Sequence, residues 1–209
     1  MLTPSKIIGI GSNYRRHIEE MGRSLPQQPK IFLMPPTALI GHGDAIVIPP
    51  GTVRVDHEAE LGVVIGRTMH CVPVDEALSY VGGYTAVNDV TARDFQRTDG
   101  VFARAKGFDT FCPAGPRIVN DIDPFNTALR CYVDGELRQD GNTADMVFDV
   151  PTLLSFVSHV MTLNPGDLLT TGTPMGVGPI LPGQTVVVEV DGIGRLENRV
   201  VARSDRGHP

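Results

Sequence analysis

The sequence predicts an α+β fold, built on a rolled mixed or antiparallel β-sheet with few, short helices. Strand-like segments outnumber helical ones, and the regular β-α alternation of a doubly wound parallel sheet is missing. The 23 glycines and 17 prolines are spread along the 209 residues, which is typical of frequent turns between short strands. A chain of this length holds one domain with a sizeable core. We therefore expect a single domain over residues 1–209, with its core at about 6–202 and a loose polar tail at 203–209.

The strands are predicted from short apolar runs that end at glycine, proline or charged residues. In chain order, these runs lie at residues 6–10, 31–33, 45–48, 58–67, 84–90, 129–133, 167–171, 185–190 and 196–202. Asp-Gly pairs at 134–135 and 191–192 predict tight hairpin turns between neighbouring strands.

Four short helical segments are predicted between these strands. Residues 151–161 carry apolar side chains at helical spacing and form the clearest helix. The others are 14–21, with Asn13 as cap and Gly22 at its end, 75–80, capped by Asp75, and a turn at 91–96, capped by Thr91.

Composition and charge exclude several classes of protein. The net charge is -6 and no long basic run occurs, so a nucleic-acid partner is not expected. All apolar runs are too short to span a membrane, and the first residues lack the features of a signal peptide. The three cysteines, Cys71, Cys112 and Cys131, show no C-x-x-C spacing, which indicates reduced thiols in a cytoplasmic protein.

Three carboxylates are the first candidates for chemistry. Glu58 and Glu60 are two residues apart, so in a strand both side chains leave the same face. Asp89 lies in a second apolar strand, where a lone carboxylate is costly to bury. Together they would form an all-oxygen site that suits Mg²⁺ or Mn²⁺. The alternative, from spacing alone, is a solvated strand face for the two glutamates and a capping role for Asp89.

Further candidates are a histidine–glutamate pair and a lysine. His17 and Glu20 share one face of the predicted helix 14–21, where the carboxylate would orient the imidazole as a general base. The alternative is a surface pair on a charged helix. Lys106 is one of only three lysines and lies beside glycine and aromatic residues. It could stabilise an oxyanion, although an ordinary surface position is the commoner outcome.

A glycine-rich loop at residues 172–178, GTPMGVG, is the last candidate. Such a loop exposes backbone N–H groups and the Thr173 hydroxyl, which suits a carboxylate ligand. A structural turn explains the loop equally well. The Gly-Lys-Ser/Thr sequence of a P-loop is missing, so a nucleotide site is not predicted.

Six segments, taken together, resemble the catalytic domain of the fumarylacetoacetate hydrolase superfamily. They are GSNYRRHIEEMG, HEAELGVVIGR, GGYTAVNDVTARD, RAKGFDTFCPAGP, VDGELRQ and LTTGTPMGVGP, and they follow the family's order between about residues 6 and 201. The resemblance implies a mixed β-roll fold of that family's C-terminal domain type and usually a homodimer. It also implies that Glu58, Glu60 and Asp89 are ligands of Mg²⁺ or Mn²⁺.

The resemblance implies roles for five other residues. His17 and Glu20 match a catalytic dyad on a segment that orders as a lid over bound ligand. Lys106 matches a lysine that faces the substrate oxygens. Gln96 matches a polar residue near the metal-bound ligand, and Thr173 matches a contact to the substrate carboxylate.

The implied activity is hydrolysis of the C–C bond of an acylpyruvate-type 2,4-dioxo acid through a metal-stabilised pyruvate enolate. Isomerisation of a 2-hydroxyhepta-2,4-diene-1,7-dioate and decarboxylation of oxaloacetate use the same enolate, and GFDTFCPAGP resembles the isomerases most. A metal-dependent binding protein without activity is the third alternative. Met34 stands where relatives usually have lysine, which implies a 2-oxo acid substrate with a less acidic tail.

Overall fold

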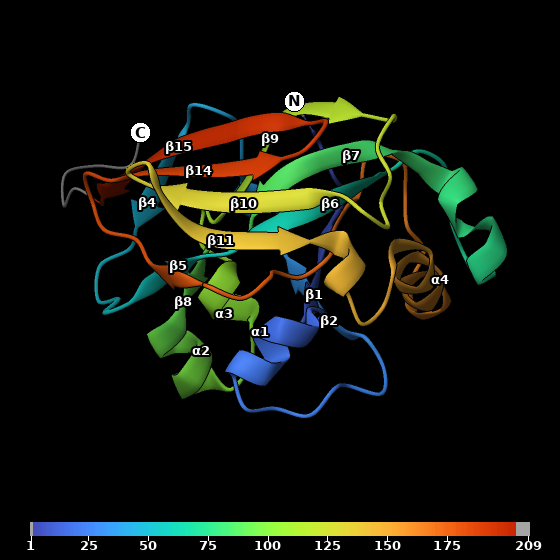
Figure 1. Ribbon diagram of the computed structural model, residues 1–209, viewed down its shortest axis with the longest axis horizontal. Helices are drawn as coiled ribbons and strands as arrows, with labels where there is room; N and C mark the ends of the chain where they lie inside the picture. The colour runs from blue at the N-terminus through green and yellow to red at the C-terminus, as the bar shows by residue number, and fades with distance from the viewer. Residues whose placement is uncertain (1, 204–209) are drawn as a thin grey trace.

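The computed structural model describes residues 2–203, and two β-sheets pack face to face in it (Figure 1). The larger sheet has the strand order β2-β1-β12-β6-β7-β9-β3. Its strands are β1 (Ile7–Gly11), β2 (Lys30–Met34), β3 (Leu39–Ile40), β6 (Ala59–Ile65), β7 (Val81–Asn88), β9 (Cys112–Val119) and β12 (Leu168–Thr170). Parallel and antiparallel pairs both occur, because β1 runs parallel to β12 but antiparallel to β2. The predicted α+β fold with a mixed sheet is confirmed.

Two smaller sheets complete the fold. The five-stranded sheet covers one face of the larger sheet and has the order β11-β10-β14-β15-β4. Its strands are β4 (Ala45–Ile48), β10 (Ala128–Val133), β11 (Glu136–Asn142), β14 (Thr185–Val190) and β15 (Gly194–Ala202). A three-stranded sheet, β13-β5-β8, consists of β5 (Val55–His57), β8 (Thr91–Ala92) and β13 (Gly178–Pro179).

Side-chain alternation along β6 decides which groups meet the core and which meet the site. Leu61, Val63 and Ile65 point between the two large sheets, where they pack with apolar side chains of β10 and β14. Since successive side chains in a strand point to opposite faces, Glu60 and Val64 point the other way. Val64 joins a second apolar cluster on that outer face. The outer face of β6 therefore carries both an apolar floor and a buried carboxylate.

Short helices cover this outer face. Figure 1 shows α1 (Arg15–Glu20), α2 (Arg93–Asp99) and α3 (Ala103–Lys106) together, on the side away from the five-stranded sheet. The longest helix, α4 (Val150–Val160), lies apart from them, next to the 3-10 helix η2 (Val74–Tyr80). Two further 3-10 turns are η1 (Pro36–Ala38) and η3 (Thr143–Asp145). No helix within residues 2–203 is both long and apolar enough to cross a membrane.

The three predicted caps are wrong. The residue that caps α1 is Tyr14, and the Asn13 amide instead donates to the backbone oxygens of Phe148 and Thr171. Helix η2 begins after Pro73 without a side-chain cap. Helix α2 begins after Ala92, because the Thr91 hydroxyl is used elsewhere. Asn13 has distant backbone partners and the Thr91 hydroxyl donates to the nearby Asp89 oxygen, so neither side chain caps the helix to which it was assigned.

Strand β9 was missed by the prediction. Two prolines, Pro113 and Pro116, interrupt its sequence and would normally argue against a paired strand. The strand pairs with β7 through an irregular register and with the two-residue strand β3 on its other side. The Asp134-Gly135 turn is confirmed, with φ angles of 51° and 82° that join β10 to β11. Most of the predicted loose tail, at residues 204–209, lies outside the described residues.

Candidate active site

Three predicted carboxylates meet on the outer face of the larger sheet. Glu60 belongs to β6, Asp89 directly follows β7, and Glu58 occupies the break between β5 and β6. The prediction began the strand at Glu58, but the backbone leaves the ladder there and β6 begins at Ala59. One oxygen of each carboxylate lies within 4.8 Å of the other two. All three side chains are buried, with Glu60 and Asp89 each 1% exposed.

Lys106 lies inside this cluster rather than on the surface. The last residue of α3, it is only 3% exposed. Its Nζ donates to Glu58 Oε2 at 2.8 Å, to Thr91 Oγ1 at 2.8 Å and to Asp89 Oδ2. The ammonium group thus supplies positive charge among the three carboxylates, and the surface alternative for Lys106 is wrong.

The carboxylates have very different acidities. Burial raises the pKa of Glu60 well above its usual value, and the negative charge of Asp89 raises it further. Burial also raises the pKa of Asp89 to about 6, despite the opposing effect of Lys106. For Glu58, burial is outweighed by Lys106 and Arg93, which lower its pKa to about 2. Burial therefore makes the charged forms of Glu60 and Asp89 costly as long as Lys106 and Arg93 are the only cations near the cluster.

These residues fit a divalent cation. Asp89 Oδ1 is buried and has no hydrogen-bond partner among residues 2–203. A buried carboxylate oxygen without a partner is costly, and a cation would satisfy it. The atoms available as metal ligands are all carboxylate oxygens, which Mg²⁺ and Mn²⁺ prefer.

Glu60 is held by the glycine-rich loop. The backbone N–H of Gly172 donates to Glu60 Oε2 at 2.7 Å. Gly172 has φ +91°, and an added Cβ would lie 2.9 Å from Asn13 Cβ, so the turn requires glycine. The predicted role of this loop in binding a carboxylate is thus partly taken by a carboxylate of the protein itself.

Arg93 is a site residue that the prediction missed. Its guanidinium donates to Glu58 Oε1, to Asp56 Oδ2 at 2.8 Å and to Gln96 Oε1 at 3.0 Å. The predicted substrate contact Gln96 is thereby oriented by the same group that neutralises Glu58. The spacing between Arg93 and Gln96, one helical turn, was the available signal.

Gln139 is a second missed residue, and it fixes Thr173. Its Oε1 accepts from Ala59 N and from His57 Nδ1, both at 2.9 Å. Its Nε2 donates to Thr173 Oγ1 and to Pro174 O, both at 2.8 Å. Thr173 Oγ1 lies 2.9 Å from the backbone oxygen of Ala59, to which it donates. The hydroxyl proton of Thr173 is therefore committed to the protein, and a ligand meets this residue through other atoms.

The predicted dyad is formed on α1. His17 Nδ1 lies 3.1 Å from Glu20 Oε2, and the His17 side chain is 9% exposed. Because a carboxylate only accepts, Nδ1 is the donor of this pair, and Nε2 is the ring nitrogen that remains for a ligand. The backbone N–H of Gly176 lies 3.4 Å from the same Glu20 oxygen, so the glycine-rich loop approaches the dyad as well.

A small cavity, here called the carboxylate pocket, brings these groups together. It has a volume of about 50 Å³ and is lined by His17, Glu58, Glu60, Asp89, Gln96, Lys106 and Thr173, among others. Seven of the eight predicted site residues therefore line one cavity, and the eighth, Glu20, is bonded to His17. The aromatic side chains Phe32 and Phe102 also line it. A volume of this size holds one or two water molecules, so a larger ligand requires the covering segments to move.

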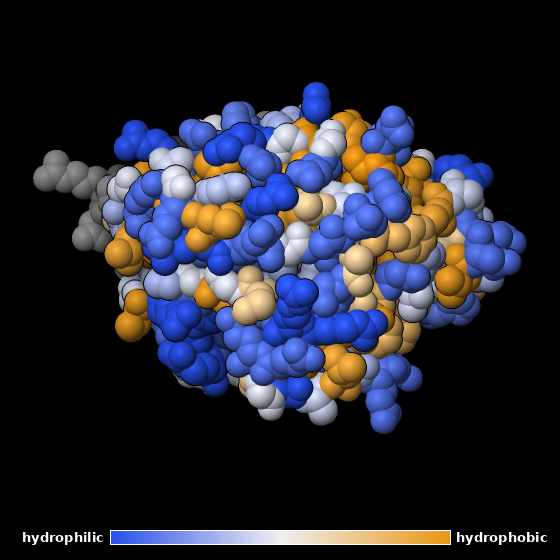
Figure 2. All heavy atoms as spheres, viewed as in Figure 1, coloured by the Kyte–Doolittle hydropathy of each residue, from blue (hydrophilic) through white to orange (hydrophobic). Residues whose placement is uncertain are grey.

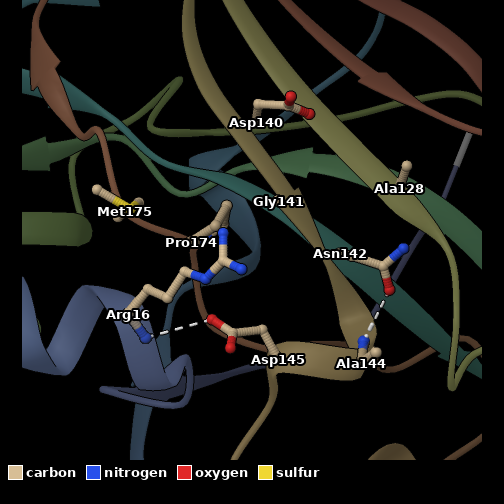
Figure 3. A pocket seen from close by; sticks show the side chains of 9 residues that line it. All are labelled: Arg16, Ala128, Asp140, Gly141, Asn142, Ala144, Asp145, Pro174 and Met175. Atoms are coloured by element: carbon tan, nitrogen blue, oxygen red, sulfur yellow. Dashed lines mark hydrogen bonds between the residues drawn. The ribbon is translucent and has the colours of Figure 1, made fainter.

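A larger cavity of about 420 Å³ lies beside α1 and β11 (Figure 3). Arg16, Asp140 and Asp145 line it, and none of the predicted site residues does. Size alone does not single out this cavity, because another one, lined by Leu39, Thr85 and Arg117 among others, has a volume of about 440 Å³. The polar groups of the cavity beside α1 are not brought together around a common point in Figure 3. Buried groups with perturbed pKa values mark the carboxylate pocket instead.

Comparisons with known proteins identify the family of the chain. The family model for the fumarylacetoacetate (FAA) hydrolase C-terminal domain matches residues 6–201. The structure of 5-carboxymethyl-2-hydroxymuconate delta-isomerase from Mycobacterium smegmatis is 50% identical, with a TM-score of 0.92 over 98% of this chain and 81% of that chain.

Relatives with other activities are similar over most of their length as well. Mitochondrial oxaloacetate decarboxylase of Dictyostelium discoideum is 41% identical over 91% of each chain. Fumarylpyruvate hydrolase from Pseudomonas aeruginosa, in complex with Mn²⁺ and pyruvate, is 31% identical, with a TM-score of 0.90 over 97% of this chain and 91% of that chain. The chain therefore belongs to the fumarylacetoacetate hydrolase family.

Proposed function

We propose that this protein is a Mg²⁺- or Mn²⁺-dependent hydrolase that cleaves the C–C bond of an acylpyruvate-type 2,4-dioxo acid. One observation carries the proposal: the His17 imidazole, held by Glu20, lines the same cavity as three buried carboxylates and Lys106. A general base and a candidate cation site thus face one small volume. Both are needed when water attacks a carbonyl next to a pyruvate unit.

Glu58, Glu60 and Asp89 would hold the divalent ion. When bound, the ion supplies Lewis-acid stabilisation of the negative charge that develops on the 2-oxo acid. Arg93 and the Gly172 N–H keep Glu58 and Glu60 in place for this role. The solved relative with Mn²⁺ and pyruvate, a fumarylpyruvate hydrolase, supports this assignment of the cation and of the substrate class.

The protein's own residues account for the water attack. His17 Nε2 accepts a proton from water, and the oxygen of that water bonds to the distal carbonyl carbon. Lys106 Nζ lies within the pocket, where its positive charge stabilises the oxygen that becomes negative, while its three N–H groups hold Glu58, Asp89 and Thr91. The C–C bond then breaks, the distal part leaves as a carboxylic acid, and the pyruvate carbon takes up a proton.

Isomerisation or decarboxylation is the second candidate. Two relatives with higher identity than the fumarylpyruvate hydrolase are an isomerase and an oxaloacetate decarboxylase. Neither reaction requires attack by water, so neither needs the His17–Glu20 dyad as a water-activating base. Product masses separate the candidates, because isomerisation preserves mass and decarboxylation releases CO₂.

A histidine variant tests the proposal. We expect His17→Ala to lower acylpyruvate cleavage by about 10²–10⁴-fold, the usual contribution of a general base. Binding of Mn²⁺, measured by calorimetry, should persist, since His17 is not among the carboxylate ligands. The control is His70→Ala, which removes an exposed histidine outside the pocket. Full turnover in His17→Ala would contradict the proposal.

We also propose, on the family resemblance, that the protein acts as a homodimer. Light scattering on the purified protein tests this, and a monomeric mass at the concentrations used for turnover would contradict it.

A further inference from the structure

A second cavity, here called the outer pocket, adjoins the carboxylate pocket. It has a volume of about 360 Å³. Five residues line both cavities: His17, Met21, Arg23, Arg93 and Gln96. The shared wall contains the dyad histidine, so a molecule that reaches from one cavity into the other passes the candidate base.

Positive charge dominates the outer pocket. Four arginines line it, Arg23, Arg54, Arg93 and Arg97, against the two carboxylates of Glu20 and Asp56. The whole chain carries a net charge of -6, so this local excess opposes the overall balance. Figure 2 shows hydrophilic side chains over the region where α1 and α2 lie, the two helices beside this pocket. An anionic ligand is favoured there.

Two of the four arginines are already neutralised. Asp56 accepts from Arg54 Nε and from Arg93 Nε, both at 2.8 Å, and its side chain is fully buried between them. Arg93 also donates to Glu58. These two guanidinium groups therefore belong to the framework of the site and are not available to a ligand.

The other two, Arg23 and Arg97, are uncommitted. Within residues 2–203, neither side chain makes a hydrogen bond or an ion pair, and Glu20 is turned toward His17. Arg23 lies just beyond α1 and Arg97 lies on α2, so two different elements contribute guanidinium groups to the lining of one cavity. Guanidinium groups placed in this way suit a carboxylate, which accepts two parallel hydrogen bonds from each.

We propose that the outer pocket is a subsite for the distal carboxylate of a dicarboxylic substrate, bound by Arg23 and Arg97. The inference rests on the proposed function, which places the pyruvate end in the carboxylate pocket and the distal carbonyl near His17. The acyl chain then continues into the outer pocket. A neutral acyl tail would leave both guanidinium groups without a partner.

This conclusion differs from the expectation based on Met34. That residue is 2% exposed and packs in the second apolar cluster with Ile7, Val64 and Val87. It lines neither cavity. The acidity of the substrate tail is therefore decided by the arginines of the outer pocket.

A matched pair of substrates tests the subsite. Succinylpyruvate and butyrylpyruvate have acyl chains of equal length that end in a carboxylate and a methyl group. With Mn²⁺ present, we expect wild-type kcat/KM to favour succinylpyruvate by at least about tenfold, mainly through KM. In Arg23→Gln and Arg97→Gln, this preference should fall several-fold each, and in the double variant it should approach one. Arg15→Gln, an exposed arginine on the same helix as His17 that lines neither cavity, should keep the wild-type ratio.

The outcomes separate this inference from the proposed function. Equal kcat/KM values for the two substrates in the wild type, or a preference that survives the double variant, would overturn the subsite. If neither compound is cleaved, the hydrolase proposal fails, and both compounds then serve as inert ligands for calorimetry. Tighter binding of succinylpyruvate that is lost in the double variant would still uphold the subsite, and equal Kd values would overturn it.

Discussion

Two buried carboxylate groups on the same sheet differ in how their charge is satisfied. Asp167 Oδ1 accepts from Ser5 N, Ser5 Oγ and Lys6 N, and its Oδ2 accepts from Lys6 Nζ and Asn164 N. Burial alone would raise its pKa, but the bonds from Lys6, Asn164 and Ser5 lower it. Asp89 is equally buried, yet its Oδ1 has no partner within residues 2–203 and its pKa is raised to about 6.

The difference in hydrogen bonding distinguishes Asp167, a structural carboxylate, from Asp89, a candidate metal ligand. Both carboxylate oxygens of Asp167 have hydrogen-bond donors within the chain, so this group needs no further ligand. The carboxylate pocket is incomplete, since Glu58, Glu60 and Asp89 share one lysine and one arginine and leave an oxygen unpaired. A metal-dependent enzyme requires a buried site of this kind, in which the carboxylate charges are destabilising without the cation and are stabilised when it binds.

The largest expected effect separates the two aspartates by activity. Asp89→Asn should lower turnover by about 10³-fold, because it removes a charged ligand from the cation site. Asp167→Asn should retain turnover per folded molecule, since it lies outside both pockets. Steady-state kinetics at saturating Mn²⁺ check both, and similar losses in the two variants would remove the distinction.

Stability should show the reverse order. Asp167→Asn leaves Lys6 unpaired and weakens several charge-assisted hydrogen bonds, so we expect the free energy of unfolding to fall by about 2–4 kcal/mol. Asp89→Asn should cost less, because it also relieves repulsion from Glu58 and Glu60. Urea unfolding without metal measures both values. A larger loss in Asp89→Asn would mean that its charge is already satisfied by Lys106.

Cation binding provides a further contrast. A ligand that binds only the folded state at 100 times its Kd adds about 2.7 kcal/mol to stability. Mn²⁺ should therefore raise the Tm of the wild type and of Asp167→Asn by several degrees. Glu60→Gln and Asp89→Asn should lose most of this rise. A full rise in both variants would place the cation elsewhere.

The smallest expected effect is the pH dependence at Asp167. Its folded pKa is lowered, so the stability that it contributes is present above its unfolded pKa, near 3.9, and is lost as the pH falls through the folded value. The stability difference between wild type and Asp167→Asn should therefore be constant near neutral pH and shrink below about pH 4. Unfolding curves between pH 3 and 7 test this, and a difference that grows in acid would contradict it.

Local sequence patterns predicted much of this molecule. Strand alternation predicted that Glu58 and Glu60 leave the same face, and both line the carboxylate pocket. Helical spacing placed His17 beside Glu20. The strands at 45–48 and 185–190 have the predicted bounds. These features depend on residues close in sequence, where periodicity and turn chemistry are sufficient.

Features that depend on distant partners were not predicted. Gln139 reaches Thr173 and the backbone of Ala59 across 34 and 80 residues, and no local pattern marks it. Asn13 looked like a helix cap but bonds to backbone more than 130 residues away. The burial of Lys106 likewise follows from the way α3 packs against β8 and β2. Tertiary contacts overrode local preference in each case.

A mass-resolved turnover assay tests the central claim most directly. Purified protein with Mg²⁺ or Mn²⁺ would be given acetylpyruvate, fumarylpyruvate, oxaloacetate and a hydroxy-dienedioate, each with and without EDTA. We expect an acylpyruvate to yield pyruvate and a second acid, with the products lost in EDTA. Isomer or CO₂ formation without such cleavage would contradict the hydrolase assignment, and cleavage that persists in EDTA would contradict the role of the carboxylate pocket as a cation site.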